Sequence, residues 1–287
     1  MAFTRLAQVS LGTFIGGVAA CLLPILFTAI QTLKPIWRDF EIPLLIIYGV
    51  LYNTLMVLAC RNDRVLYQVV VRSGNLGLAF AAGLLLSFSG VSWATFGWYL
   101  TVISFFHWSE YFFTATTNPR SLTLESFLLD HSREYELAVV ASCTEYFLEW
   151  FIYPEMKQIT ILSVVGLLLT LGGEALRKIS MVTAGISFNH YVQRTKHSDH
   201  HLVTSGVYSL FRHPSYVGWF WWSVGTQIML LNPLCMVGYA VVSWRFFNER
   251  IYDEERHLLN FFGEDYLNYQ RLTPTGLPFI KGFRVPL

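Results

Sequence analysis

Long apolar runs separated by short polar segments dominate the chain from end to end. A helix that spans a bilayer needs roughly 20 predominantly apolar residues. Eight runs approach this length, at 9–30, 42–59, 65–88, 93–113, 137–153, 159–182, 216–230 and 233–247. The pattern predicts an all-α polytopic membrane protein with about eight transmembrane helices.

The last two apolar runs are short, and only Leu231, Asn232 and Pro233 join them, which predicts an antiparallel helical hairpin. A polar segment at 185–212 precedes the hairpin, and loops of that length are often functional. A second segment, 248–269, follows it, with apolar residues at helical spacing and an acidic opposite face. We therefore expect a separate tail helix facing the polar loop on one side of the membrane.

Composition supports a membrane protein, because only 14% of the 287 residues are charged, whereas soluble proteins carry about 25%. The net charge is +1 and no basic stripe is present, which argues against a nucleic-acid partner. The four scattered cysteines form no CxxC pair. We expect one integral membrane domain over 1–287, made of an N-terminal two-helix segment (1–60), central spans (61–184) and a catalytic region (185–287).

Charge distribution predicts the orientation. With eight spans, 17 of the 20 Lys and Arg residues lie on the side of the two termini, including Arg177 and Lys178. Only Lys34, Arg38 and Lys157 lie on the other side. Because positive charge accumulates on the cytosolic side, both termini are expected to be cytosolic.

Polar residues that bracket the hairpin are the candidates for a site. Arg212-His213-Pro214 opens it, and Pro at a first turn with an Arg flank also fits an ordinary helix start. Arg250 and Glu254 follow the hairpin and are four residues apart, so they share a helix face. A plain alternative is a solvated amphipathic helix, but acids at a cytosolic membrane face oppose the local positive bias. We favour a site in which Arg250 binds an anion and Glu254 accepts donors from a second ligand.

His197-Ser198-Asp199-His200-His201 is the strongest competing signal, since HxxHH resembles a histidine box of membrane di-iron oxidases. One box cannot supply two iron coordination spheres, so we expect no metal. No G-x-G-x-x-G motif occurs, so a nucleotide-like cofactor would not sit on a Rossmann sheet.

Two further features concern the spans themselves. Glu110, Glu145 and Glu149 lie in or near them, and intramembrane acids usually face a bundle interior, but the sequence does not identify their partners. Gly12 and Gly16 form a GxxxG pattern in the first span, which permits close helix approach. Packing within the chain is the favoured interpretation, and homodimerisation is the alternative.

Taken together, the C-terminal motifs resemble the isoprenylcysteine carboxyl methyltransferases. The resemblance rests on His200 to Val203 with Gly206 and Tyr208, on 212–219 (RHPSYVGW), on Arg250 with Glu254-Glu255, on Phe262-Gly263-x-x-Tyr266, and on the closing 274–282. It covers roughly the C-terminal half, and the last stretch resembles the animal members.

That resemblance implies an enzyme that uses S-adenosylmethionine to methylate the C-terminal prenylcysteine carboxylate of CaaX-processed proteins such as Ras-like GTPases, in the endoplasmic reticulum membrane. It implies that Arg250 meets the substrate carboxylate. It also implies a set of cofactor contacts: Gln193, His200, His201, Leu202, Val203, Tyr208, His213, Pro214, Ser215, Tyr216 and Glu254. His201 departs from relatives, which often carry Thr or Lys there.

The implied chemistry needs no general base, because a carboxylate is already ionised at neutral pH. The lipid is expected to enter sideways from the bilayer and the cofactor from the cytosol, with S-adenosylhomocysteine as product. An NADPH-dependent sterol reductase of related fold is the nearest alternative, followed by the di-iron oxidase, and then by a non-enzymatic scaffold or channel. Prenyl preference and oligomeric state are not legible in the sequence.

Overall fold

The computed structural model describes residues 3–60, 62–129, 132–196 and 200–284, and within these ranges it contains helices and no strands. The α-helices are α1 (Arg5–Ala29), α2 (Lys34–Cys60), α3 (Arg64–Ser87), α4 (Thr95–Thr117), α5 (Arg133–Ile152), α6 (Thr160–Ala184), α7 (Pro214–Leu230), α8 (Pro233–Phe262) and α9 (Glu264–Leu272). Five short 3₁₀ helices lie between them, η1 (Pro119–Ser121), η2 (Leu124–Phe127), η3 (Pro154–Gln158), η4 (Gly185–Ser187) and η5 (Gly206–Ser209).

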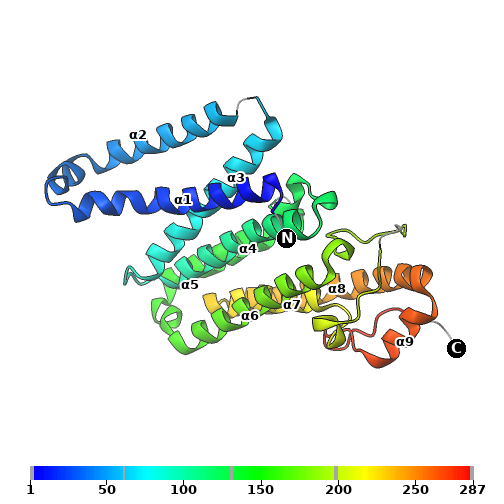
Figure 1. Cartoon of the computed structure of the whole chain (residues 1–287). Coiled ribbons are helices and arrows are strands. Elements are labelled where there is room, and N and C mark those ends of the chain that lie inside the picture. Colours follow the sequence, from blue (N-terminus) through cyan, green and yellow to red (C-terminus); the bar gives the residue numbers. More distant parts are fainter. Residues whose placement is uncertain (1–2, 61, 130–131, 197–199, 285–287) are drawn as a thin grey trace.

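Large apolar side chains on most of these helices face outward rather than into the protein. Three helical segments, Arg5–Ile25, Arg64–Ser87 and Thr160–Ser187, are long and apolar enough to cross a membrane. Exposed apolar patches of this extent mark contact with lipid. The chain is therefore an all-helical membrane protein, and the eight-span count stays a prediction. Figure 1 shows α1 and α2 as a hairpin at one side of the helix bundle and α9 near one end of it.

Glycines set the closest helix contacts. A Cβ at Gly173 of α6 would lie 2.5 Å from the Gly218 carbonyl oxygen of α7, and one at Gly17 of α1 would lie 2.1 Å from the Gly74 oxygen of α3. Small residues allow this approach between membrane helices. The favoured interpretation of the GxxxG pattern, close packing within the chain, was wrong, because no atom of the described residues lies within 4 Å of a Cβ at Gly12 or Gly16.

The α7–α8 hairpin has the predicted connection, but its second arm differs from the prediction. α8 runs unbroken for 30 residues, so the expected tail helix begins inside it. The break comes at Gly263, where a φ of 54° favours glycine, and α9 follows. The polar residues after Phe247 led to the prediction that the helix ends there, but they do not interrupt its backbone hydrogen bonds.

Two acids of α5 fix the far end of the hairpin. Glu145 accepts hydrogen bonds from the backbone N–H groups of Leu234 and Cys235 at 2.7 and 2.6 Å, which caps the start of α8. Glu149 pairs at 2.6 Å with Lys157, whose ammonium also donates to the last carbonyls of α7. Lys157 is thus a buried structural group rather than an exposed flanking charge.

Candidate active site

The start of α7 is fixed by contacts from the C-terminal segment. Pro214 occupies the first helical turn, where its missing N–H needs no partner. The backbone N–H groups of Arg212 and His213 donate to the carbonyls of Pro274 and Thr275 at 2.8 and 3.3 Å. The Arg212 side chain is buried, so it is not the solvent-facing membrane flank that a plain helix start would have.

Glu255 of α8 is the centre of this junction and is fully buried. Its carboxylate accepts from Arg212 Nε at 2.8 Å, His213 Nε2 at 3.1 Å, and Gln270 Nε2 and the Phe283 N–H at 2.9 Å. Burial alone would raise the pKa of this carboxyl, but His213 and Arg212 outweigh it and hold the pKa below its ordinary value. The acidic face of the predicted tail helix is therefore partly internal, and sequence reasoning missed this role for Glu255.

Arg250 and Glu254 lie one turn apart on α8, as their spacing predicted, and both contact Tyr216 of α7. Arg250 Nε donates to the Tyr216 hydroxyl at 2.8 Å, and that hydroxyl donates to Glu254 Oε2 at 2.5 Å. A second Arg250 nitrogen donates to the His190 backbone carbonyl. The guanidinium is partly buried and is held on two sides, which suits the orientation of a planar anion.

A cavity of about 110 Å³ lies on the Glu254 side of Tyr216. Of the predicted cofactor residues, it is lined by His201, Leu202, Val203, Tyr208, His213, Ser215, Tyr216 and Glu254. A neighbouring cavity of about 70 Å³ is lined by Gln193, His200, His201 and Glu254. Pro214 lines neither cavity and acts through the start of α7. The structure thus brings together residues that are up to 61 positions apart in the chain, across the loop, α7 and α8.

A third and much smaller cavity, of about 10 Å³, is lined by Tyr216 and Arg250. Its walls are largely apolar and include Leu128, Trp219 and Phe246. Phe188, Asn189 and Tyr216 line both this cavity and the 110 Å³ cavity. The candidate carboxylate site and the candidate cofactor site are therefore adjacent and share a wall.

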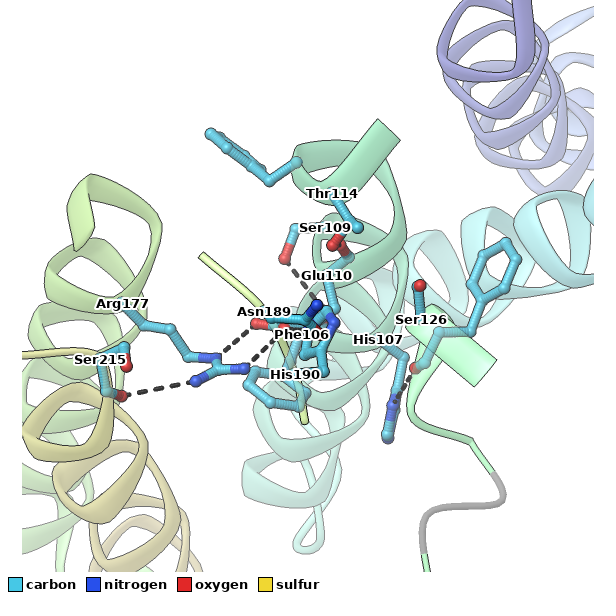
Figure 2. Close-up of polar contacts among 12 residues, drawn as sticks. Phe106, His107, Ser109, Glu110, Thr114, Ser126, Arg177, Asn189, His190 and Ser215 are labelled. Carbon is cyan, nitrogen blue, oxygen red and sulfur yellow. Dashed lines mark hydrogen bonds and ion pairs between the residues drawn. The ribbon is translucent and has the colours of Figure 1, made fainter. Parts of the chain in front are cut away.

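Behind the third cavity lies a buried network centred on Glu110 of α4 (Figure 2). Its carboxylate accepts from Arg177 Nε and Nη2 at 2.6 and 2.7 Å, from His190 Nε2 at 2.7 Å, and from Lys178. Figure 2 shows Arg177 reaching from α6 between Glu110 and Ser215. Because Arg177 is only 1% exposed, it and Lys178 are internal counterions rather than exposed flanking charges, and their side of the membrane stays a prediction.

The loop that carries His190 is fixed by hydrogen bonds from the end of α4. Asn118, at the end of α4, donates to the carbonyls of Ile186 and Phe188 at 3.1 and 2.9 Å. In the sequence, the contacts of Glu110 and Asn118 were indicated only by the presence of polar residues in or next to apolar runs. Of the histidine-box motif, His197 and Asp199 lie outside the described residues, and the described part of the chain contains no group of three metal-ligating side chains.

The polar lining of the 110 Å³ cavity fits a ligand with both polar and aromatic parts. Among the described residues, the buried Tyr266 hydroxyl on its wall lacks a hydrogen-bond partner of acceptable geometry. Buried polar groups are normally satisfied, so this hydroxyl is suited to meet a polar ligand atom. The Glu254 carboxylate can accept donors, and tyrosine rings supply flat apolar faces.

Comparison with known proteins identifies the family. A family model described as the isoprenylcysteine carboxyl methyltransferase (ICMT) family matches residues 164–260. A Protein-S-isoprenylcysteine O-methyltransferase of Xenopus laevis is 53% identical over 99% of both chains. The chain belongs to the isoprenylcysteine carboxyl methyltransferase family. The matched region holds the α7–α8 hairpin, Arg250 and Glu254.

Other isoprenylcysteine carboxyl methyltransferases agree in sequence and in fold. A Homo sapiens relative of the same name is 52% identical over 98% of this chain and 95% of its own. A solved structure titled as a eukaryotic intramembrane Ras methyltransferase is 39% identical, with a TM-score of 0.90 and coverage of 98% of this chain and 100% of that one. The resemblance noted in the C-terminal half therefore extends over nearly the whole chain.

Proposed function

We propose that this protein transfers a methyl group to the α-carboxylate of a C-terminal prenylated cysteine, with Arg250 binding that carboxylate. Membership of a family whose relatives are named protein-S-isoprenylcysteine O-methyltransferases supports the reaction. The observation that carries the site assignment is the position of Arg250, held by Tyr216 and His190 in a largely apolar cavity beside the polar one. The comparisons favour neither a sterol reductase nor a di-iron oxidase.

S-adenosylmethionine is the methyl donor that we propose, and it supplies a methyl group on a sulfonium centre when bound. The Tyr266 hydroxyl, the Glu254 carboxylate and the tyrosine ring faces, all on the wall of the 110 Å³ cavity, fit such a group. Glu254 would accept from its ammonium or ribose hydroxyls. Tyr208 and Tyr216 would pack against its adenine, together with the backbone of 200–203. No metal is part of this proposal.

The residues around Arg250 orient the acceptor and do not activate it. A prenylcysteine carboxylate is ionised at neutral pH, so no proton has to be removed. A guanidinium binds a carboxylate through parallel hydrogen bonds and fixes its direction. Apolar groups such as Trp219 and Phe246 exclude water from the carboxylate, and both line the cavity that contains Arg250. Positioning and water exclusion are thus the roles that the chain itself supplies.

The membrane setting follows the same logic. Exposing a prenyl chain costs about 0.8 kcal/mol for each CH₂-sized unit, so the lipid is best kept in the bilayer. We propose the endoplasmic reticulum membrane, eight spans, cytosolic termini, Ras-like GTPases among the substrates, and a catalytic region at 185–287. A homodimer through the exposed Gly12–Gly16 face is the oligomeric proposal, supported by the absence of any atom within 4 Å of a Cβ at either glycine among the described residues.

The test is methyl transfer from radiolabelled S-adenosylmethionine to S-farnesylcysteine by the reconstituted protein. Arg250→Ala is expected to abolish turnover and to leave S-adenosylhomocysteine affinity, measured by calorimetry, unchanged. Arg245→Ala is the matched control, because Arg245 lies on the same helix but is exposed and pairs with Glu249 at the surface. Unchanged turnover in Arg250→Ala would remove the carboxylate assignment. Absence of methyl transfer by the wild type would refute the function.

A further inference from the structure

The C-terminal segment 273–280 returns from α9 toward the middle of the hairpin. Figure 1 shows the C-terminal stretch, in red, turning back beside α9. Leu277 and Ile280 are buried in one apolar cluster with α7 residues from Tyr216 to Val224. Gly276 makes the approach close, since a Cβ there would lie 2.5 Å from Val217. A non-helical segment is therefore packed beside the first half of α7.

A contact between the segment 273–280 and α8 indicates how deep the segment lies in the membrane. The Trp244 indole donates to the Pro278 carbonyl at 2.8 Å. Trp244 is 11 residues beyond Pro233, or about 16 Å along the helix, and it lies three residues before the end of the apolar run at 247. The same part of α8 carries an exposed apolar stripe at Leu234, Val237, Val241 and Val242, with Leu234 77% exposed. This stripe suits lipid acyl chains, and Pro278 lies at the level where it ends.

Much of the carbonyl side of the segment's backbone is paired within the protein. Non-helical chain at membrane depth is tolerated only where its polar groups are satisfied by protein. The carbonyls of Pro274, Thr275, Leu277, Pro278 and Ile280 accept from Arg212 N, His213 N, Ile280 N, Trp244 Nε1 and Thr275 Oγ1, respectively. Pro278 also has no N–H that would need a partner.

Phe279 is the exception to this burial. It lies at the third position of the turn from Leu277 to Ile280, with a φ of 63°, where glycine is usual. Its side chain is 92% exposed within the protein. A strained backbone that directs a large apolar ring outward is unexpected in water, but it suits a ring surrounded by lipid.

We infer that 273–280 is a re-entrant loop in the leaflet on the side of the cofactor cavity, with the Phe279 ring among the acyl chains. Exposed Lys281 and Arg284 follow directly, at the level where cations meet lipid headgroups. The loop accepts hydrogen bonds from the N–H groups of Arg212 and His213, so a membrane-embedded element supports two residues that line the candidate cofactor site. The inference does not depend on the reaction that the protein catalyses.

Hydroxyl-radical footprinting of the unmodified chain tests this loop. The protein is placed in nanodiscs of phosphatidylcholine and phosphatidylserine, and oxidation at each aromatic residue is normalised to the denatured chain. Phe279 is expected to be protected. Tyr252 is the control, since it is 52% exposed and lies eight residues, or about 12 Å, beyond Trp244 on α8. Oxidation of Phe279 as extensive as that of Tyr252 would overturn the inference.

A second measurement identifies what covers the ring. A photoreactive p-benzoylphenylalanine replaces Phe279 or, in the control, Tyr252, and the chain is irradiated in the same bilayers. Each variant is first required to keep the thermal unfolding midpoint of the unmodified chain. We expect a phospholipid adduct with the variant at 279 and none with the variant at 252. Crosslinks at 279 to protein only, or equal lipid adducts at both positions, would contradict the loop.

Discussion

The Tyr216 hydroxyl receives a hydrogen bond from Arg250 Nε at 2.8 Å, although 34 positions separate the two residues in the chain. The same hydroxyl donates to Glu254, so one phenol links the candidate carboxylate and cofactor groups. Its ring is stacked on Phe247, with centroids 5.1 Å apart, which fixes the hydroxyl between them.

Tyr216→Phe is predicted to keep the ring and lose both hydrogen bonds. Bonds to charged groups contribute about 1.5–3 kcal/mol, so kcat/KM for farnesylcysteine should fall roughly 10- to 100-fold. Steady-state methylation assays measure the effect. Tyr252→Phe, at an exposed position, should keep wild-type kinetics. Equal kinetics in the two variants would show that the linking hydroxyl has no role.

Glu254→Gln is predicted to weaken S-adenosylhomocysteine binding. The amide keeps the shape but accepts less strongly from a cationic or hydroxyl donor, so the Kd should rise by about 10-fold or more. Isothermal titration calorimetry gives the value. Asp253→Asn, beside it on α8, is the control and should leave the Kd unchanged. An unaltered Kd in Glu254→Gln would contradict the cofactor assignment.

Glu255 should make stability depend on pH. Because its folded pKa is depressed, it contributes stability above its unfolded pKa of about 4.3, and this contribution is lost as pH falls through the folded pKa. Glu255→Gln leaves Arg212 uncompensated and should cost about 3 kcal/mol at pH 7, with a flatter acid dependence. Thermal unfolding in detergent from pH 7 to pH 3 measures both. Glu249→Gln, in an exposed pair, should differ little from the wild type.

Glu110→Ala is predicted to be among the most destabilising single changes in the chain. It leaves Arg177 and Lys178 without their shared carboxylate, and breaking a buried pair costs about 3–5 kcal/mol. The unfolding midpoint in nanodiscs should drop sharply. Wild-type stability of this variant would mean that solvent reaches the network.

Gly17 and Gly16 form a matched pair for packing. Gly17→Ala should displace α1 from α3 and cost about 1–3 kcal/mol, because its Cβ would overlap the Gly74 carbonyl. Gly16→Ala meets no neighbour and should be nearly neutral in monomeric protein. Unfolding of both variants in the same detergent tests the difference, and equal stability would contradict the packing.

The sequence was sufficient for the features that depend on local spacing. The i, i+4 relation of Arg250 and Glu254 placed them on one helix face, and the three-residue link predicted the α7–α8 hairpin. The helical fold and the family followed from the apolar runs and the C-terminal motifs. The individual site roles stay proposals, since the comparisons name the family and not its contacts.

Features that depend on distant parts of the chain were not predictable. Glu255 resembled a solvated acid because its partners come from the start of α7, from α9 and from the C-terminal segment. Arg177 resembled a flanking charge because Glu110 is 67 positions away. The continuity of α8 was missed because polar side chains change the hydropathy of a helix without interrupting its backbone.

Because α8 is continuous, its apolar N-terminal part and its polar C-terminal part form one rigid body. α8 extends for about 45 Å, from the cap at Glu145 to Gly263, with Arg250, Glu254 and Glu255 on its last turns. If a thicker or thinner membrane tilts the apolar part of α8, all three side chains move together. Membrane thickness is therefore expected to affect the geometry of the candidate site.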